Sequence, residues 1–261
     1  MRVCSTIVIG LVIACSGGMS VFAEDDEQDV ETTLPGVLVR YSVTGSKTES
    51  AEAVVAVPRL FGKAGQSPHV GVPANGFHVE WSGVLLIPYQ GQYTLTARRQ
   101  TLTDLSIVID DQAIAFGSPV ELSQGPVPFK ISGIQTVDES AFELWWRSTI
   151  FPDEPIEARH FRYDPARLTT QEPSVSDRAD RGMVLAETHG CIRCHSVAEM
   201  WSESLSESLS AEQTLPGPKL DDLGRRVNAS WLFRWIKNPQ TLRHGTPMPH
   251  LFADSADEDR A

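Results

Sequence analysis

The residues whose types and spacing could most clearly do chemistry are Cys191 and Cys194, followed directly by His195. Cys-x-x-Cys-His is the attachment motif of a c-type haem. Two thiols on one helical turn can form thioether bonds with the two vinyl groups of a porphyrin, and the next histidine can supply a neutral imidazole to the iron. The motif therefore predicts one covalently attached haem c, with His195 as an axial ligand.

Two other chemistries use a pair of cysteines at this spacing. A thiol–disulfide site is expected in a thioredoxin-like βαβ context, and no such pattern is visible in the sequence. A zinc site needs more soft ligands, but the other two cysteines, Cys4 and Cys15, lie near the N-terminus. Haem attachment is therefore the favoured interpretation.

The composition limits the classes of partner. The chain has 261 residues, a net charge of −12 and 41% hydrophobic residues, enough for one large domain or two of ordinary size. Such acidity argues against nucleic acid, because no basic face is offered to phosphates. It suits a redox partner with a basic docking face, although plain solubility is the favoured reason for it.

Residues 1–23 have the pattern of an export signal. Arg2 precedes an apolar run at residues 3–14 that is too short to span a bilayer, and small residues precede a cleavage point after Ala23. A second interpretation is a bacterial lipobox in which Cys15 is lipidated. Cleavage after Ala23 is favoured, and both interpretations predict a protein exported to the periplasm or the cell surface.

After an acidic, disordered tail at residues 24–33, residues 34–165 have the pattern of β-structure. Short runs rich in β-branched and aromatic residues alternate with turn formers. These runs are residues 37–41, 76–81, 84–88, 93–97, 105–109 and 142–146. Many short strands without helices between them predict an antiparallel β-sandwich or barrel.

A polar, aperiodic linker is expected at residues 166–177, and the pattern beyond it is helical. One helix should run through Gly182 into the cysteine motif, and another should begin at Asn228 or Ser230. The second helix has apolar residues on one face at helical spacing: Trp231, Leu232, Trp235 and Ile236. We therefore expect two domains, an N-terminal antiparallel β-sandwich and a C-terminal all-α domain over residues 178–261.

The order of strands and turns over residues 34–165 resembles the protective-antigen-type domain, the β-sandwich first described in the anthrax toxin translocation component. The resemblance rests on residues 81–88, 91–95, 107–111, 120–126 and 144–146. It implies a carbohydrate- or surface-binding role. Some members bind sugar through a paired-aspartate calcium site, but residues 100–104 lack Asp-Asp-Gly, and Asp110 and Asp111 lie in a later turn. A structural or weakly binding module is therefore favoured.

Residues 178–251 resemble the class I cytochrome c domain, especially the single-haem kind found in larger exported bacterial proteins. Four elements occur in the family's order: a helix with Gly182, the Cys-x-x-Cys-His motif, a Pro-Gly-Pro-x-Leu loop at residues 216–220, and a Thr-Pro-Met-Pro loop at residues 246–249. The fold that we expect for the C-terminal domain is therefore cytochrome c-like.

The resemblance implies a role for each site residue. His195 is the proximal ligand, and the carbonyl of Pro218 accepts a hydrogen bond from its second ring nitrogen. Met248 is the distal ligand, a thioether that raises the potential. His244 and His250 are the fallback axial ligands, and a bis-His iron would have a lower potential.

The chain departs from the cytochrome c family at its end. The family has a further helix that packs across the first helix near Gly182, whereas the residues after Met248 are few and acidic. We therefore expect the sequence to be a piece of a longer protein.

The predicted function is an exported monohaem electron carrier with an attached β-sandwich, and no catalytic residues are predicted. The first alternative is the electron-transfer arm of a larger oxidoreductase, or a peroxidase-like enzyme. The second is a cell-surface carbohydrate-binding protein.

Overall fold

The computed structural model describes residues 32–45, 50–69, 71–169, 175–195, 217–220 and 223–252, without side chains at 175–177, 179 and 180. The predicted export segment with Cys15, most of the acidic tail, part of the predicted linker and the last nine residues lie outside the described residues.

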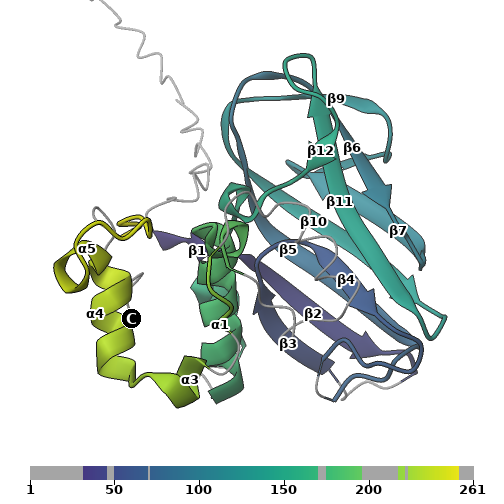
Figure 1. The fold of residues 1–261 in the computed structure, drawn as a ribbon. Helices are drawn as coiled ribbons and strands as arrows, with labels where there is room; N and C mark the ends of the chain where they lie inside the picture. The colour runs from purple at the N-terminus through teal and green to yellow at the C-terminus, as the bar shows by residue number, and fades with distance from the viewer. Residues whose placement is uncertain are drawn as a thin grey trace, which may run out of the picture.

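Two antiparallel sheets face each other and form a β-sandwich (Figure 1). The eight-stranded sheet has the order β1-β13-β5-β10-β7-β8, and β2 pairs with both β5 and β3. The strands of this sheet are β1 (Leu34–Pro35), β2 (Val37–Val43), β3 (Ser50–Val55), β5 (Phe77–Ile87), β7 (Leu102–Ile109), β8 (Gln112–Ile114), β10 (Gly125–Gln135) and β13 (Phe161–Tyr163).

The five-stranded sheet has the order β12-β11-β6-β9, with β4 paired to β11. Its strands are β4 (Arg59–Gly62), β6 (Gly91–Arg98), β9 (Pro119–Leu122), β11 (Ser140–Ser148) and β12 (Glu154–Pro155). Side chains alternate in both sheets: in β10, Phe129 and Ile131 are buried while Lys130 is exposed. Such alternation directs one face of each sheet into a shared core.

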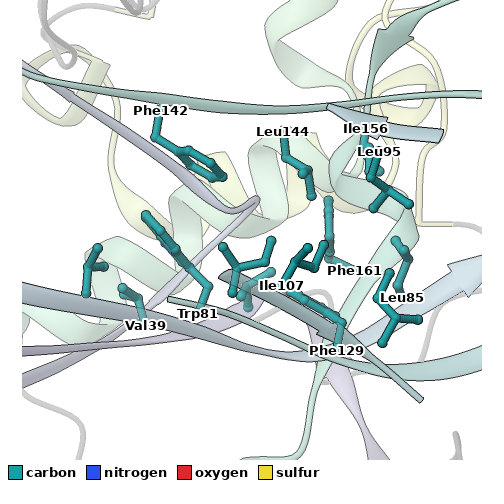
Figure 2. Close-up of a cluster of buried hydrophobic side chains, with 14 of the residues drawn as sticks. Val39, Trp81, Leu85, Leu95, Ile107, Phe129, Phe142, Leu144, Ile156 and Phe161 are labelled. Atoms are coloured by element: carbon teal, nitrogen blue, oxygen red, sulfur yellow. The ribbon is translucent and has the colours of Figure 1, made fainter. Parts of the chain in front are cut away.

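Aromatic side chains from the two sheets meet in that core (Figure 2). Trp81 of β5 stacks on Phe142 of β11 with ring centroids 4.9 Å apart, and both side chains are fully buried. Farther along the core, the ring centroids of Trp146 and Tyr93 lie 5.6 Å apart. Large aromatic pairs of this kind supply much of the apolar burial that holds two sheets together.

A single long helix packs against the sandwich. Helix α1 (Val175–Thr188) contacts β3, and Val184 is buried between Ala56 and Ala158. A short 3-10 turn, η4 (Cys191–Arg193), follows α1, and the remaining helices are α3 (Leu223–Arg226), α4 (Ala229–Lys237) and α5 (Pro239–Leu242). Among the described residues, no helix combines the length and apolar character needed to cross a membrane.

The predicted fold class, a β-sandwich followed by an all-α cytochrome c-like domain, is wrong. The chain is mostly β-sheet with a few short helices, and α4 buries none of its residues. The clusters of buried apolar side chains in the described residues lie within the sandwich, or between it and α1. A helical domain needs a core of its own, whereas α1 uses the sandwich as its partner.

Gly182 of α1 has open space beside it. A Cβ added at this residue would meet no atom of the described residues within 4 Å.

We predict opposite effects for alanine at two glycines. A Cβ at Gly83 of β5 would lie 2.5 Å from the carbonyl oxygen of Arg162, a backbone atom that cannot move without breaking the sheet. Gly83→Ala should therefore lower the free energy of unfolding by about 1–3 kcal/mol. Gly182→Ala should leave it unchanged or raise it by up to about 1 kcal/mol, because alanine favours helix. Urea unfolding measures both effects, and equal effects would contradict the close pairing of β13 with β5.

A second prediction concerns His160, whose Nδ1 lies 3.0 Å from the Leu86 carbonyl oxygen and whose ring contacts Trp146 at 4.8 Å. Burial lowers the pKa of this imidazole. Between the lowered native pKa and the unfolded pKa of about 6.5, the unfolded chain binds more protons than the native protein. The free energy of unfolding should therefore fall as the pH drops through this range. His160→Phe should remove this part of the slope in unfolding experiments at several pH values. An unchanged slope would contradict the burial.

Candidate functional site

A pocket of about 380 Å³ lies where the end of α1 meets the sandwich. Its sandwich wall comes from β4, β11, β12 and the 3-10 turn η2 (Ala158–His160), and its other wall comes from the end of α1 and from η4. Its charged and polar lining includes Arg59, Glu143, Glu157, Arg159, Glu187, His189, Arg193 and Cys194. A cavity of this volume accommodates a small molecule.

Glu143 lies between two arginines in the register of the five-stranded sheet. The register of the sheet places Glu143 of β11 opposite Arg59 of β4 and opposite Arg98 of β6. Arg98 is held in place, because its guanidinium lies 3.8 Å from the ring centre of Trp145 and pairs with Asp153. Opposite charges on neighbouring strands stabilise one another and fix their side chains.

A buried ion pair joins the two walls of the pocket. Arg59 donates a hydrogen bond to Glu187 of α1, and the two side chains are 17% and 4% exposed. Burial raises the pKa of the Glu187 carboxyl, while the guanidinium of Arg59 opposes that rise. The guanidinium of Arg59 thus favours the charged form of a carboxyl whose pKa burial raises, and the pair attaches α1 to β4.

A second carboxylate links η2 to η4. Glu157 accepts a hydrogen bond from Arg193 at 2.7 Å and forms an ion pair with Arg159 at 2.9 Å. Both arginines line the pocket together with Glu157. The rim is therefore built from ion pairs whose members belong to different segments of the chain.

The cysteine motif forms the turn after α1. Gly190 adopts a left-handed conformation with φ of 68°, which ends the helix and starts η4. The amide of His195 donates to the carbonyl of Cys191 at 3.0 Å. Burial raises the pKa of the Cys191 thiol, and Cys194 lines the pocket.

Residues 217–220 lie against this turn. Nδ1 of His195 is 2.7 Å from the carbonyl oxygen of Pro218, and the amide of Gly217 donates to the carbonyl of Cys194 at 2.6 Å. A Cβ at Gly217 would lie 2.5 Å from that same carbonyl oxygen, so the close approach requires glycine. The structure thus brings four predicted site residues together: Cys191, Cys194, His195 and Pro218.

The predicted distal ligand belongs to a different segment. Met248 is half-buried in the loop after α5, and its amide donates to Oγ1 of Thr246 at 3.3 Å. His244 and His250 are exposed on the same loop. The end of this loop reaches α1, because the ring of Phe252 lies 4.5 Å from that of His189.

Sequence reasoning missed most of the pocket. Arg59, Glu143 and Glu187 come from three distant segments, and no spacing between them marks a site. Arg193 lies inside the cysteine motif, but its partner Glu157 is separated from it by 36 positions. Pairing across the sheets, rather than a local pattern, assembles these charges.

Comparison with known proteins finds no family model and no curated protein that matches the chain. Among solved structures, an anti-sigma factor domain-containing protein from Clostridium clariflavum is similar at 18% identity and a TM-score of 0.43, over 49% of this chain and 47% of that one. The chain covers about half the length of this protein and of a second anti-sigma factor domain-containing protein.

Two PA14 domains are similar over their whole length. The PA14 sugar-binding domain from an RTX adhesin matches 50% of this chain and 99% of its own, at 13% identity and a TM-score of 0.38. The PA14 domain of the MpAFP antifreeze protein matches 57% of this chain and 100% of its own, at 12% identity and a TM-score of 0.39. At these values the similarities assign the chain to no family.

These findings overturn the identification of a class I cytochrome c domain at residues 178–251, and with it haem c, its iron and electron transfer. The similar structures reported above are anti-sigma factor domain proteins and PA14 domains. Within the part of the chain that the structure describes, no three His, Cys, Asp or Glu side chains gather into a group that could hold a metal ion. A redox partner with a basic docking face therefore has no support.

We predict strong coupling between Arg59 and Glu187. Arg59→Leu leaves a buried carboxylate without its cation and should lower the free energy of unfolding by about 3–5 kcal/mol. The double variant Arg59→Leu/Glu187→Leu removes both charges and should recover most of that loss. Chemical unfolding of the two single variants and the double variant tests this, and additive effects would show that the pair does not join α1 to the sandwich.

Proposed function

We propose that this chain is a carbohydrate-binding β-sandwich protein, and that the pocket between the sandwich and the end of α1 is its binding site. The observation that carries the proposal is the convergence of carboxylates and guanidinium groups in a cavity of about 380 Å³. That volume suits one or two sugar rings rather than a large cofactor.

The lining offers the hydrogen-bonding groups that sugars require. Each sugar hydroxyl both donates and accepts, so a binding site needs acceptors and donors side by side. Glu143 and Glu157 are acceptors, and Arg59, Arg159 and Arg193 are donors. Hydrogen bonds that involve a charged partner are about twice as strong as neutral ones.

The charged groups are held in place before any ligand arrives. Glu187 fixes Arg59, while Glu157 is held between Arg159 and Arg193. Side chains that are already ordered lose less conformational entropy on binding. The pocket is therefore suited to bind a polar ligand without rearrangement.

The proposed site does not use a calcium ion. Asp104, Asp110 and Asp111 adopt left-handed backbone conformations typical of turns, and none of them lines the pocket. Binding should therefore persist in the presence of a chelator.

The RTX adhesin domain is described as sugar-binding, so neutral and acidic oligosaccharides are the first ligands to test. The pocket, rather than that likeness, supports the proposal. We also propose that the chain acts outside the cytoplasm, in the periplasm or at the cell surface, where the export pattern of residues 1–23 would place it.

We predict that Glu143→Gln weakens retention on immobilised oligosaccharides by roughly ten- to a hundredfold, since a charge-assisted hydrogen bond contributes about 1.5–3 kcal/mol. The matched control is Glu121→Gln, the same change on β9 of the same sheet but outside the pocket. Glycan-array binding and affinity chromatography measure the effect, and thermal unfolding confirms that both variants fold.

Equal binding by the two variants would show that the pocket is not the site. Failure of the wild-type protein to bind any sugar on the array would contradict the proposed function itself.

A further inference from the structure

We propose that helix α4, together with Leu242 of α5, forms a docking face for lipid bilayers that carry anionic headgroups. We call this set of residues the α4 face: Trp231, Leu232, Phe233, Arg234, Trp235, Ile236, Lys237 and Leu242. The inference rests on observations outside the proposed sugar pocket, which none of these residues lines.

The α4 face is amphipathic and partly exposed: Trp231, Leu232, Trp235 and Ile236 are half-buried, whereas Phe233, Arg234, Lys237 and Leu242 are exposed. At 100° per residue, the five apolar residues of α4 occupy one continuous arc, and Arg234 and Lys237 occupy the opposite side. None of the nine residues of α4 is buried. Phe233 is 42% exposed and Leu242 is 39% exposed, so apolar side chains are open to a partner.

The aromatic residues suit the boundary between water and lipid. Trp231 and Trp235 stack with their ring planes 10° apart and their centroids at 5.3 Å. Tryptophan is enriched at this boundary because its ring is apolar and its N–H is polar. Nζ of Lys237 lies 5.9 Å from the centre of the Phe233 ring, so a cation accompanies the exposed aromatic side chain.

The charge of this segment is opposite to that of the whole chain. Residues 217–252 contain two acidic residues, Asp221 and Asp222, while the net charge of the chain is −12. The basic residues of the segment are Lys219, Arg225, Arg226, Arg234, Lys237 and Arg243. The following residues, 253–261, contain four acidic residues and one arginine, so the cations that matter here are those of α4 itself. Arg234 and Lys237, beside exposed apolar side chains, complement a surface that is both apolar and anionic.

The position of α4 makes such contact feasible. Helices α3, α4 and α5 lie on the side of α1 that faces away from the two sheets (Figure 1). A flat surface can therefore approach α4 while the sandwich extends away from it. At 1.5 Å per residue α4 is about 13 Å long, which suits a helix lying in the interface.

A bilayer fits the α4 face better than a nucleic acid or an acidic polysaccharide. Those polymers would satisfy the cations, but they offer no apolar phase for the exposed side chains of Phe233 and Leu242. A membrane interface satisfies both, because apolar side chains enter the acyl region while Lys and Arg remain among the headgroups.

Vesicle co-sedimentation tests the inference, with the chain from Glu24 onward, the form predicted after signal cleavage. Binding to phosphatidylglycerol–phosphatidylcholine vesicles should exceed binding to phosphatidylcholine vesicles and should weaken as salt is added. Arg234→Gln/Lys237→Gln should lower partitioning by roughly twenty-five-fold, about fivefold for each cation removed. Phe233→Ser/Leu242→Ser should also lower it, and both pairs of residues are exposed, so the variants should fold.

The matched control is Lys130→Gln/Arg147→Gln, two exposed cations on the sandwich, which should leave partitioning unchanged. Equal binding to neutral and anionic vesicles would overturn the inference. So would a control variant that loses as much vesicle binding as Arg234→Gln/Lys237→Gln. Stronger binding to polygalacturonate than to the anionic vesicles would also overturn it, in favour of an acidic polymer. The Arg234→Gln/Lys237→Gln variant should still be retained on oligosaccharides. This second measurement distinguishes a loss of membrane binding from a loss of sugar binding.

Discussion

The arrangement of the molecule depends on the buried ion pair between Arg59 and Glu187. Arg59 belongs to β4 and Glu187 to the last turn of α1, and these residues are 128 positions apart in the sequence. Burial disfavours the charge on Glu187 and the guanidinium of Arg59 favours it, so the loss of Arg59 alone should weaken this contact. This requirement holds the end of α1 against the five-stranded sheet. The pocket, its rim and the turn that carries the cysteines are all placed by that contact.

The sandwich supplies the rigidity on which this contact relies. Trp81 and Phe142 join the two sheets through fully buried rings, and the alternating strands around them leave Glu143 on the outer surface of β11. The pocket therefore has a fixed wall of β-sheet and a second wall of helix and turn. Helix α4 lies on the side of α1 that faces away from the sheets (Figure 1) and carries both basic and apolar side chains. The molecule thus presents two separate surfaces, one polar and concave and the other amphipathic and exposed.

Local patterns in the sequence were informative where structure depends on near neighbours. The alternation of Phe77, Val79 and Trp81 with less buried residues, and the capping of α4 by Asn228, follow from residues close together in the chain. The helical pattern around Gly182 was equally clear, but it could not show that Val184 packs on Ala56 and Ala158 rather than on a second helix. That choice depends on tertiary packing, and it is why an all-α domain was wrongly predicted. The pocket was missed because its charges meet only after the sheets have paired.

Chemical-shift mapping of the isotope-labelled protein with an oligosaccharide that it retains would show whether the pocket is the binding site. Binding in the pocket should shift the amide resonances of Glu143, Glu157 and Arg193, which lie on three separate segments that meet only there. The resonances of β7 and β8, at the opposite edge of the other sheet, should stay unchanged. Shifts confined to β7, β8 or the α4 face, with none at the pocket, would contradict the account.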